Sequence, residues 1–395
     1  MKSYFADLHI HVGCAENGAW VKIPSSRRLT VRNILQEAKN RKGIDLIGIV
    51  DCMAPPVLGD LRRLQAEGRL LPRTGGGYCF EGSTTLLTGA EIETVEANGK
   101  QSHTLIFLPD LAAMETFAAT MAKYIRNIAI STQNAHMPLG SLIDIATAFE
   151  ALIIPAHIFT PHKGLYGACT RRLTQILSER QISAIAGVEL GLSADSTMAD
   201  RIGELAPFSF MTNSDAHSPD KIAREYNRLL LAEPSYRELA LALARKDGRQ
   251  IEENYGLDPR LGKYHRTLCD ACGHVETESK TVLQLCPACG SKKIVRGVFD
   301  RIDDIADYNL PRHPAFRNPY FYQIPLAFIP GVGKAAIERL LTVFGTEMAV
   351  LHQAAPQALA AVVGEKTAAA ILAARSGEAR IAAGAGGVYG RMLKM

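Results

Sequence analysis

The stretch that decides the fold is "FADLHIHVG", residues 5–13, in which polar and aliphatic residues alternate. A β-strand turns successive side chains to opposite faces, so Asp7, His9 and His11 lie on one face and the aliphatic residues on the other. The aliphatic face is expected to pack into a core. A face with one carboxylate and two imidazoles is typical of a metal site, because both groups are common metal ligands. An edge strand with a solvated polar face is the alternative.

The bulk composition is that of an ordinary globular protein. The chain has 395 residues, of which 47% are hydrophobic, and this length is expected to form two or three domains. No run reaches the roughly 18 apolar residues of a membrane span, and charged residues begin too early for a signal peptide. The sequence therefore predicts a cytoplasmic protein with no membrane partner.

Apolar runs of strand length alternate with helical patterns in the first half of the chain. The expected strands are nearly continuous in hydrophobicity and span 45–51, 85–93, 102–108, 151–159, 184–191 and 208–217. The expected helices span 30–40, 111–128 and 140–151. This alternation predicts a parallel β/α sheet or barrel. Aperiodic stretches that begin at residue 245 and at residue 303 predict linkers to two smaller modules.

Metal-ligating residue types stand at or near the carboxyl ends of these strands. In chain order they are His9, His11, Asp51, Glu91, Glu93, His157, Glu189, Asp215 and His217, with His103 at the start of its strand. A β/α barrel gathers the carboxyl ends of its strands around one rim, where active sites are built. We therefore expect these side chains to converge. Each one alone has a simpler explanation, since a buried histidine is often a hydrogen-bonded core residue and Asp51 or Glu189 can cap a helix.

The pattern D-x-H-x-H at 7–11, with Asp51, Glu91, His103, His157 and S-D-A-H at 214–217, resembles the polymerase and histidinol phosphatase (PHP) superfamily. The resemblance covers roughly the first 230 residues and implies a distorted (β/α)7 barrel, which we assign to residues 1–245. It also implies two or three divalent ions, with Zn²⁺ favoured over Mn²⁺ or Mg²⁺. The implied ligands of one ion are His9, His11, Glu91 and Asp215, and those of the second are Glu91, His103 and His157. Asp215, Glu91 and His217 are the implied catalytic residues.

A third ion is the open question in this resemblance. Members with three metals usually have histidine after the second-motif aspartate, whereas this chain has Cys52. Cys52 is either a thiolate ligand, with His217 and Cys14, or an inert buried thiol. We favour the inert thiol.

Two C-x-x-C-G motifs, "CDACG" at 269–273 and "CPACG" at 286–290, predict a second metal site of a different kind. Four thiolates at this spacing form a closed, tetrahedral zinc site that is structural rather than catalytic. The expected ligands are Cys269, Cys272, Cys286 and Cys289, in an independent zinc ribbon at 260–300.

The C-terminal region, 326–395, is expected to be an all-α helix-hairpin-helix domain that binds DNA. "FIPGVGKAAIERLLTVFG", residues 328–345, has a glycine turn followed by an amphipathic helix, and 359–375 is a weaker second copy. Glycines at a helix amino terminus let backbone N–H groups approach a phosphate. The candidate contacts are Gly331, Gly333, Lys334, Gly364 and Lys366. A compact helical bundle whose glycines only form turns is the alternative.

The order of barrel, ribbon and hairpins resembles the endonuclease Q family along nearly the whole chain. That family implies a DNA repair endonuclease, associated with the nucleoid, that hydrolyses the phosphodiester on the 5′ side of uracil, hypoxanthine, xanthine or an abasic site. The implied products carry 3′-hydroxyl and 5′-phosphate ends. Reading such a base requires its extrusion from the duplex. Candidates for the base pocket or its rim are His162, Tyr166, Arg171 and Tyr255, with Lys163 and Tyr264 nearby.

Two other functions are compatible with the sequence. One is a PHP-type phosphatase of small phosphomonoesters, which would leave the ribbon and the hairpins unexplained. The other is a non-catalytic DNA-binding repair platform, which the cysteine at position 52 keeps open. The sequence also leaves open whether a sliding clamp or another repair protein is a partner.

Overall fold

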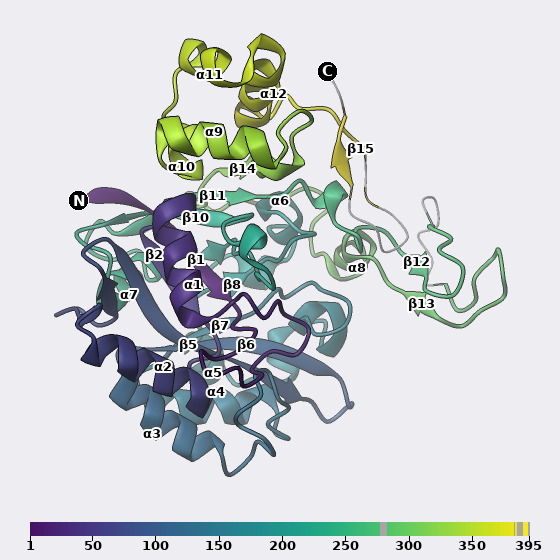
Figure 1. Ribbon diagram of the computed structural model, residues 1–395. Coiled ribbons are helices and arrows are strands. Elements are labelled where there is room, and N and C mark those ends of the chain that lie inside the picture. Colours follow the sequence, from purple (N-terminus) through teal and green to yellow (C-terminus); the bar gives the residue numbers. More distant parts are fainter. Residues whose placement is uncertain (277–282, 383, 385–389, 394–395) are drawn as a thin grey trace.

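The computed structural model describes residues 1–276, 283–382, 384 and 390–393. It has a mixed α/β body, a small cysteine-containing module and a helical C-terminal region (Figure 1). Residues 277–282 of the predicted ribbon lie outside the described residues. So do 383, 385–389 and 394–395 of the predicted helical region.

Seven strands form the distorted barrel of the α/β body. They are β1 (Lys2–Ile10), β2 (Leu46–Ile49), β5 (Thr84–Val95), β6 (Gln101–Leu108), β7 (Leu152–Pro155), β8 (Val188–Glu189) and β9 (Phe210–Met211). Ladders join β1, β2, β5, β6 and β7 in that order, and β8 pairs with β9. The circuit closes through single bridges, Ile153 to Ile185 on one side and Ile10 to Ala216 on the other. The closure is irregular because β8 and β9 are only two residues long.

The predicted parallel direction of the barrel strands is wrong for β6 alone among the seven. This strand pairs antiparallel with both β5 and β7, whereas the other barrel neighbours run parallel. Because β6 is reversed, its first residues lie at the same rim as the last residues of the parallel strands. His103 therefore reaches the rim from the start of its strand.

The sheet also extends beyond the barrel. From β1 it continues through β10 (Tyr226–Leu231), β11 (Gln250–Gly256) and β14 (Tyr320–Tyr322), and beside β5 it carries β4 (Tyr78–Phe80) and β3 (Leu70–Pro72). β11 and β14 lie in the stretches predicted as linkers, and that prediction is wrong for both. Their tyrosines and phenylalanine stack in the sheet, as Tyr255 does on Tyr226 and Phe321 at 4.9 and 5.3 Å.

Helices cover the outside of the barrel. The longer ones are α1 (Val31–Glu37), which continues as a π-turn over Ala38–Lys42, α2 (Pro55–Ala66), α3 (Leu111–Met121), α4 (Leu139–Thr147) and α7 (Tyr236–Leu243). Thr30 and Asp110 begin α1 and α3 as N-caps by accepting backbone N–H groups. α3 ends at Met121 rather than near 128, and Ile125 turns back into the core. Two short helices, α5 (Glu179–Ser183) and α6 (Ser196–Ala199), lie between β7 and β9.

The cysteine-containing module pairs β12 (Leu268–Cys269) with β13 (Ile294–Val295) and leads into α8 (Val298–Ile305). The helical region then contains α9 (Lys334–Phe344), α10 (Glu347–His352), α11 (Pro356–Val363) and α12 (Glu365–Ser376). A short pair of strands, β15 (Ile381–Ala382) and β16 (Arg391–Met392), follows. Among the described residues, none forms a helix long and apolar enough to cross a membrane.

Ion pairs hold the helical region against the π-turn of the barrel. Arg41 donates two hydrogen bonds to Glu338, at 2.8 and 3.1 Å, and the buried Lys42 ammonium lies 2.8 Å from Glu347. His352 stacks on Phe5 at 4.6 Å and shares a 2.7 Å hydrogen bond with the Tyr226 hydroxyl. In Figure 1 the helical region lies next to the end of the sheet with β10, β11 and β14, with α9 and α10 nearest and α11 and α12 farther out.

Candidate metal centre

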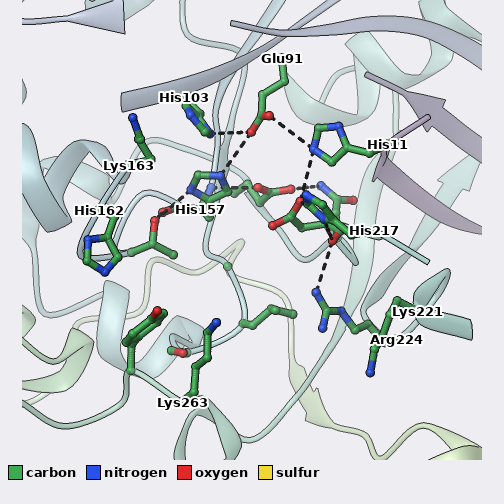
Figure 2. Close-up of a pocket in the computed structure, with 18 of the residues that line it drawn as sticks. His11, Glu91, His103, His157, His162, Lys163, His217, Lys221, Arg224 and Lys263 are labelled. Carbon is green, nitrogen blue, oxygen red and sulfur yellow. Dashed lines mark hydrogen bonds and ion pairs between the residues drawn. The ribbon is translucent and has the colours of Figure 1, made fainter. Parts of the chain in front are cut away.

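Two groups of ligand-type side chains meet at the rim of the barrel. One consists of His9, His11 and Asp215, and the other of Glu91, His103 and His157. In each group the offered ligand atoms lie within 4.8 Å of one another. The residues come from β1 and the position directly after it, from β5 and β6, and from the loops after β7 and β9. Positions more than 200 residues apart in the chain therefore share one site. Figure 2 shows Glu91 between the histidines of both groups.

Glu91 faces both groups through its two oxygens. Its Oε1 lies 3.5 Å from His9 Nε2 and 3.4 Å from His157 Nε2, and its Oε2 lies 3.4 Å from His11 Nε2. Asp215 Oδ1 lies 3.5 Å from both His9 Nε2 and His11 Nε2. Two ligand atoms at about 2.1 Å from one tetrahedral ion are about 3.4 Å apart. These spacings fit ions held between the side chains better than direct hydrogen bonds.

Three buried imidazole nitrogens have no hydrogen-bond partner among the described residues: His9 Nε2, His11 Nε2 and His103 Nδ1. His103 Nδ1 lies 2.8 Å from Glu91 Oε1, but the ring is not aligned to donate a hydrogen bond to it. Buried polar atoms are rarely left without a partner. All three nitrogens face the two groups, so a bound cation would satisfy them.

The other nitrogen of each of these rings is held by a carboxylate. His9 Nδ1 lies 3.1 Å from both oxygens of Glu189, and His11 Nδ1 lies 3.1 and 3.2 Å from those of Asp51. His103 Nε2 lies 3.3 Å from Glu93. A carboxylate behind a histidine fixes the tautomer that directs a lone pair at a metal and makes the imidazole a stronger ligand. The Asp51 and Glu189 side chains therefore hold the rings of His11 and His9.

The electrostatics favour a cation at this site. Burial would raise the pKa of Glu91, but His103 and Lys22 outweigh it and hold the pKa well below its usual range. Burial would likewise raise the pKa of Asp215, but His9 holds it well below the ordinary value. Burial lowers the pKa of His9, yet Glu189 and Asp215 raise it well above 6.5 overall. The carboxylates stay ionised and attract positive charge, which a metal ion can supply in place of ring protons.

Two residues of the groups have an unusual backbone conformation. His157 has φ of 28° and Asp215 has φ of 45°, values that side chains other than glycine seldom adopt. Such strain persists only where surrounding contacts enforce it, and it is found often at functional sites. Here the Glu189 carboxylate accepts the His157 N–H at 2.8 Å, and Arg224 donates to the Asp215 carbonyl at 3.3 Å.

Three residues considered from the sequence lie outside the two groups. Asp7 is buried and accepts backbone N–H groups from Ser214 and Ala223, at 3.0 and 2.8 Å, so it secures the loop after β9 and belongs to neither group. The Cys52 thiol lies in the core, donates to the Ile49 carbonyl at 3.1 Å and has its pKa raised to about 12 by burial. The Cys14 thiol donates to the Arg27 carbonyl at 3.0 Å. These contacts support the inert thiol at position 52.

His217 lies beside the first group without belonging to it. Its ring centroid is 4.6 Å from that of His11, and its Nδ1 is 3.0 Å from the Asp215 carbonyl oxygen. Burial, together with the charge of His11, lowers the pKa of His217 to about 4. With Nδ1 donating to the carbonyl, Nε2 of the neutral ring is a proton acceptor.

Lys22, Lys221 and Arg224, three cations around the site, could not be predicted from a sequence pattern. The buried Lys22 ammonium lies 3.1 Å from Glu91 Oε2. Lys22 belongs to an aperiodic loop, so no spacing rule marks it, and only the folded chain brings it to Glu91. Lys221 and Arg224 follow β9 in the chain and also line the site.

A cavity of about 570 Å³ opens beside the two groups. His162, Lys163 and Tyr264 line it, as do Lys263 and Ser193. Its size is within the usual range for ligand pockets.

Three of the four pocket candidates lie elsewhere, and the sequence prediction is wrong for them. Tyr166 is buried in the core, where its hydroxyl donates to Glu204. Arg171 points away and donates to the Asp304 carbonyl after α8. Tyr255 is held in the sheet by stacking on Tyr226. Apolar packing decided the orientations of Tyr166 and Tyr255, and a carbonyl in another element decided that of Arg171. The composition of a loop does not reveal either kind of contact.

The four predicted cysteines come together in the small module. All four Sγ atoms lie within 4.8 Å of one another, and the pairs Cys269–Cys289 and Cys272–Cys286 are each 3.7 Å apart. Four thiolates at 2.3 Å from a tetrahedral zinc are about 3.8 Å apart, whereas disulfide sulfurs are about 2.05 Å apart. Gly273 and Gly290, with φ of 74° and 68°, close the turns by donating to Cys269 and Cys286. The group has the geometry of a zinc site.

The predicted hairpin glycines all lie at helix starts. Gly331 has φ of 91°, Gly333 is the N-cap of α9, and Gly364, with φ of 81°, separates α11 from α12. Lys334 and Lys366 are exposed in the first turns of α9 and α12. The two turns lie side by side, because a Cβ on Gly331 would be 3.1 Å from Thr367. One surface therefore presents two helix amino termini and two lysines.

Comparisons with known proteins match this arrangement along the whole chain. No family model matches. The crystal structure of PfuEndoQ from Pyrococcus furiosus, described as a novel lesion-specific endonuclease, superposes with a TM-score of 0.83 and 32% identity, covering 99% of this chain and 95% of that one. The chain belongs to the endonuclease Q family.

A further endonuclease Q structure and two uncharacterized proteins are also similar to this chain. A structure of endonuclease Q bound to a 27-mer duplex substrate with an abasic lesion at the active site gives a TM-score of 0.84 at 32% identity, with 99% and 96% of the two chains covered. Uncharacterized protein YqxK of Bacillus subtilis is 45% identical over 99% of this chain and its own full length. Uncharacterized protein MJ0043 of Methanocaldococcus jannaschii is 37% identical over 52% of this chain and 28% of its own.

Proposed function

We propose that this endonuclease Q member is a metal-dependent endonuclease that nicks DNA on the 5′ side of a deaminated base or an abasic site. The expected products carry 3′-hydroxyl and 5′-phosphate ends. The observation that carries the proposal is the pair of ligand groups that share Glu91 at one cavity mouth. It occurs in a chain similar over 99% of its length to an endonuclease Q bound to abasic duplex.

His9, His11, Glu91 and Asp215 would hold one divalent ion, and Glu91, His103 and His157 a second. Zn²⁺ suits this mixture of imidazole and carboxylate, and Mn²⁺ is the next candidate. Ions at such a site acidify a bound water and stabilise the departing oxygen of a phosphodiester. The three partnerless imidazole nitrogens support this assignment.

The protein's own groups have distinct parts in this proposal. Glu189, Asp51 and Glu93 hold the rings of His9, His11 and His103 in the orientation that frees one nitrogen of each. Lys22, Lys221 and Arg224 line the cavity as cations and are suited to a phosphate oxygen. The neutral His217 ring, with Nε2 as acceptor, can take a proton from a water or serve as a further ligand.

The remaining modules would bind the duplex. The adjoining turns at Gly331, Gly333 and Gly364, with Lys334 and Lys366, are suited to grip the sugar-phosphate backbone, which carries no sequence information. A Zn²⁺ ion in the four-cysteine group would stabilise the small module. We propose the division 1–245, 260–300 and 326–395 for catalysis, zinc binding and DNA binding. Binding to DNA would place the protein at the nucleoid.

The test is a nicking assay on labelled duplexes that each carry one uracil, one hypoxanthine or one abasic position. We expect a nick 5′ to the lesion that requires a divalent ion and is absent from undamaged duplex. Asp215→Asn should abolish nicking and leave duplex affinity unchanged, because Asp215 belongs to the ion site and not to the hairpins. Turnover retained by Asp215→Asn, or no nicking of any lesion by the wild type, would overturn the proposal.

A further inference from the structure

We infer that Thr132 is a positioning residue of the metal centre, which holds the Lys22 ammonium back from the shared carboxylate Glu91. Thr132 belongs to the loop between α3 and α4. The inference rests on the proposed function and deepens it, because it names the residue that keeps Glu91 open to an ion although a buried cation lies beside it.

Thr132, Lys22 and Glu91 form a closed triangle of contacts. The Lys22 ammonium lies 3.1 Å from Glu91 Oε2 and also contacts the Thr132 hydroxyl. The Thr132 hydroxyl lies 2.6 Å from the same Glu91 oxygen. His11 Nε2, which belongs to the first ligand group, lies 3.4 Å from that oxygen. The ammonium and the hydroxyl therefore meet at the Glu91 oxygen that faces the first ion site.

The chemistry of the three groups fixes the direction of each hydrogen bond. An ammonium can only donate, and an ionised carboxylate can only accept. The Thr132 hydroxyl must therefore accept from Lys22 and give its single proton to Glu91. Lys22 in turn divides two of its three protons between Thr132 and Glu91, and the third remains for the phosphate oxygen proposed above.

The loop backbone is pinned on both sides of Thr132. The Ser131 N–H donates to the Val21 carbonyl at 2.8 Å, and the Ala135 N–H donates to the Glu93 carbonyl at 2.9 Å. Val21 directly precedes the lysine of the triangle, and Glu93 lies two residues beyond its glutamate. Thr132 itself has φ of 53°, a value that branched residues seldom adopt and that persists only where surrounding contacts enforce it. The fold therefore fixes the hydroxyl between the ammonium and the carboxylate.

An ion in the first site and the ammonium compete for the same oxygen. Lys22 is only 9% exposed, so solvent and salt screen its charge little. Without the hydroxyl, the ammonium would turn to Glu91 alone, and a unit positive charge would take the place of a neutral donor at Oε2. Positive charge at that oxygen opposes the binding of a divalent ion. Thr132 limits this competition because it offers the ammonium a neutral acceptor.

The test is calorimetric titration of the metal-depleted protein with Mn²⁺, which avoids the cysteine group because thiolates select zinc. Thr132→Val keeps the branched shape and removes the hydroxyl. It should weaken Mn²⁺ binding about 10- to 100-fold, the range for changes to groups behind metal ligands. Thr132→Ser, which keeps the hydroxyl, should bind Mn²⁺ as the wild type does. Lys22→Met removes the competing charge and should strengthen Mn²⁺ binding.

Combining the two substitutions separates this role from general damage to the loop. In a protein that carries Lys22→Met, Thr132→Val should no longer weaken Mn²⁺ binding, because no ammonium is left to hold back. Thr88→Val is the matched control. It removes a buried hydroxyl on β5, the strand of Glu91, that donates to the Leu108 carbonyl at 2.9 Å, and it should leave Mn²⁺ affinity unchanged.

A loss of equal size with and without Lys22→Met, or an unchanged affinity in Thr132→Val, would overturn the inference and leave the proposed function standing. Should Thr132→Val fail to fold, Lys22→Met still decides, because Mn²⁺ binding no tighter than that of the wild type would overturn the inference. A wild type that binds no Mn²⁺ and nicks no lesion would overturn both the inference and the proposed function.

Discussion

Replacing Glu189 by glutamine tests whether the carboxylates behind the histidines build the metal centre. Glu189 accepts three donors: His9 Nδ1 at 3.1 Å, the His157 N–H at 2.8 Å and Asn213 Nδ2 at 2.8 Å. It therefore orients a ligand from each of the two groups. The substitution keeps the shape of the side chain and removes its charge.

The magnitude follows from those contacts. An amide has one acceptor oxygen, so its NH₂ group must face one of the three donors. Asn213 cannot turn to compensate, because its Oδ1 accepts the N–H of Leu8 at 2.9 Å. An unmet buried donor costs roughly 1–3 kcal/mol, and the neutral bond to His9 is about 1 kcal/mol weaker than the charged one. The unmet donor destabilises the fold with or without the metal, so the loss of metal affinity comes from the weaker hold on His9 and should be roughly the 10- to 100-fold typical of such changes.

The assay is calorimetric titration of the metal-depleted protein with Mn²⁺, which avoids the cysteine group because thiolates select zinc. Nicking should show the same shift in the Mn²⁺ concentration needed and recover at saturating metal. Glu93→Gln is the matched control, since Glu93 holds His103 of the other group at 3.3 Å and should weaken a different binding step. Unchanged Mn²⁺ affinity in Glu189→Gln would refute the assignment of these groups as metal ligands.

Three further predictions concern stability, DNA binding and the cysteine module. Burial raises the pKa of Glu225 from 4.5 to about 8, so between these pH values the folded state holds a proton that the unfolded chain has lost. The free energy of unfolding therefore falls by up to about 1.4 kcal/mol for each pH unit that the pH rises. Glu225→Gln should flatten this slope in urea melts at pH 5 to 8, and an unchanged slope would exclude Glu225 as its source. The double variant Lys334→Ala and Lys366→Ala should weaken duplex binding. It should also reduce the steepness of the logarithm of the binding constant against the logarithm of the salt concentration by roughly 2. A slope equal to that of the wild type would show that these lysines do not contact phosphates. Cys272→Ser should lose zinc, because it removes one of four thiols that lie within 4.8 Å of one another. Elemental analysis measures this, and zinc content equal to that of the wild type would contradict the four-cysteine assignment.

Much of the site could be predicted because its residues obey local rules. His9 and His11, at the end of β1 and directly after it, follow the two-residue period of a strand, and His157 follows the carboxyl end of β7, one of the strand ends that a barrel gathers at one rim. The C-x-x-C-G spacing is likewise local, and the structure brings its four thiols within 4.8 Å. In such cases the grouping of the side chains depends on a few consecutive residues, so the period of the strand and the spacing of the motif are sufficient to predict it.

The errors concern contacts between distant segments. β6 runs against its neighbours, which hydrophobicity cannot reveal because both directions bury the same side chains. Tyr166 and Tyr255 have the composition of binding-loop residues, yet packing directs one into the core and the other into the sheet. Lys22 lies in a loop without periodicity and reaches Glu91 only in the folded chain.

The sequence by itself determined which ligand chemistry is present and in what order the modules follow, since residue types and short spacings carry that information. Only the tertiary structure decided that Asp7 secures a loop while Glu189 orients His9, although both are carboxylates on barrel strands. It also decided that Lys263 lies across the cavity from Glu91. The physical reason is that these roles depend on which distant backbone and side-chain groups meet when the barrel closes, and hydrogen-bond partners across such separations leave no local pattern.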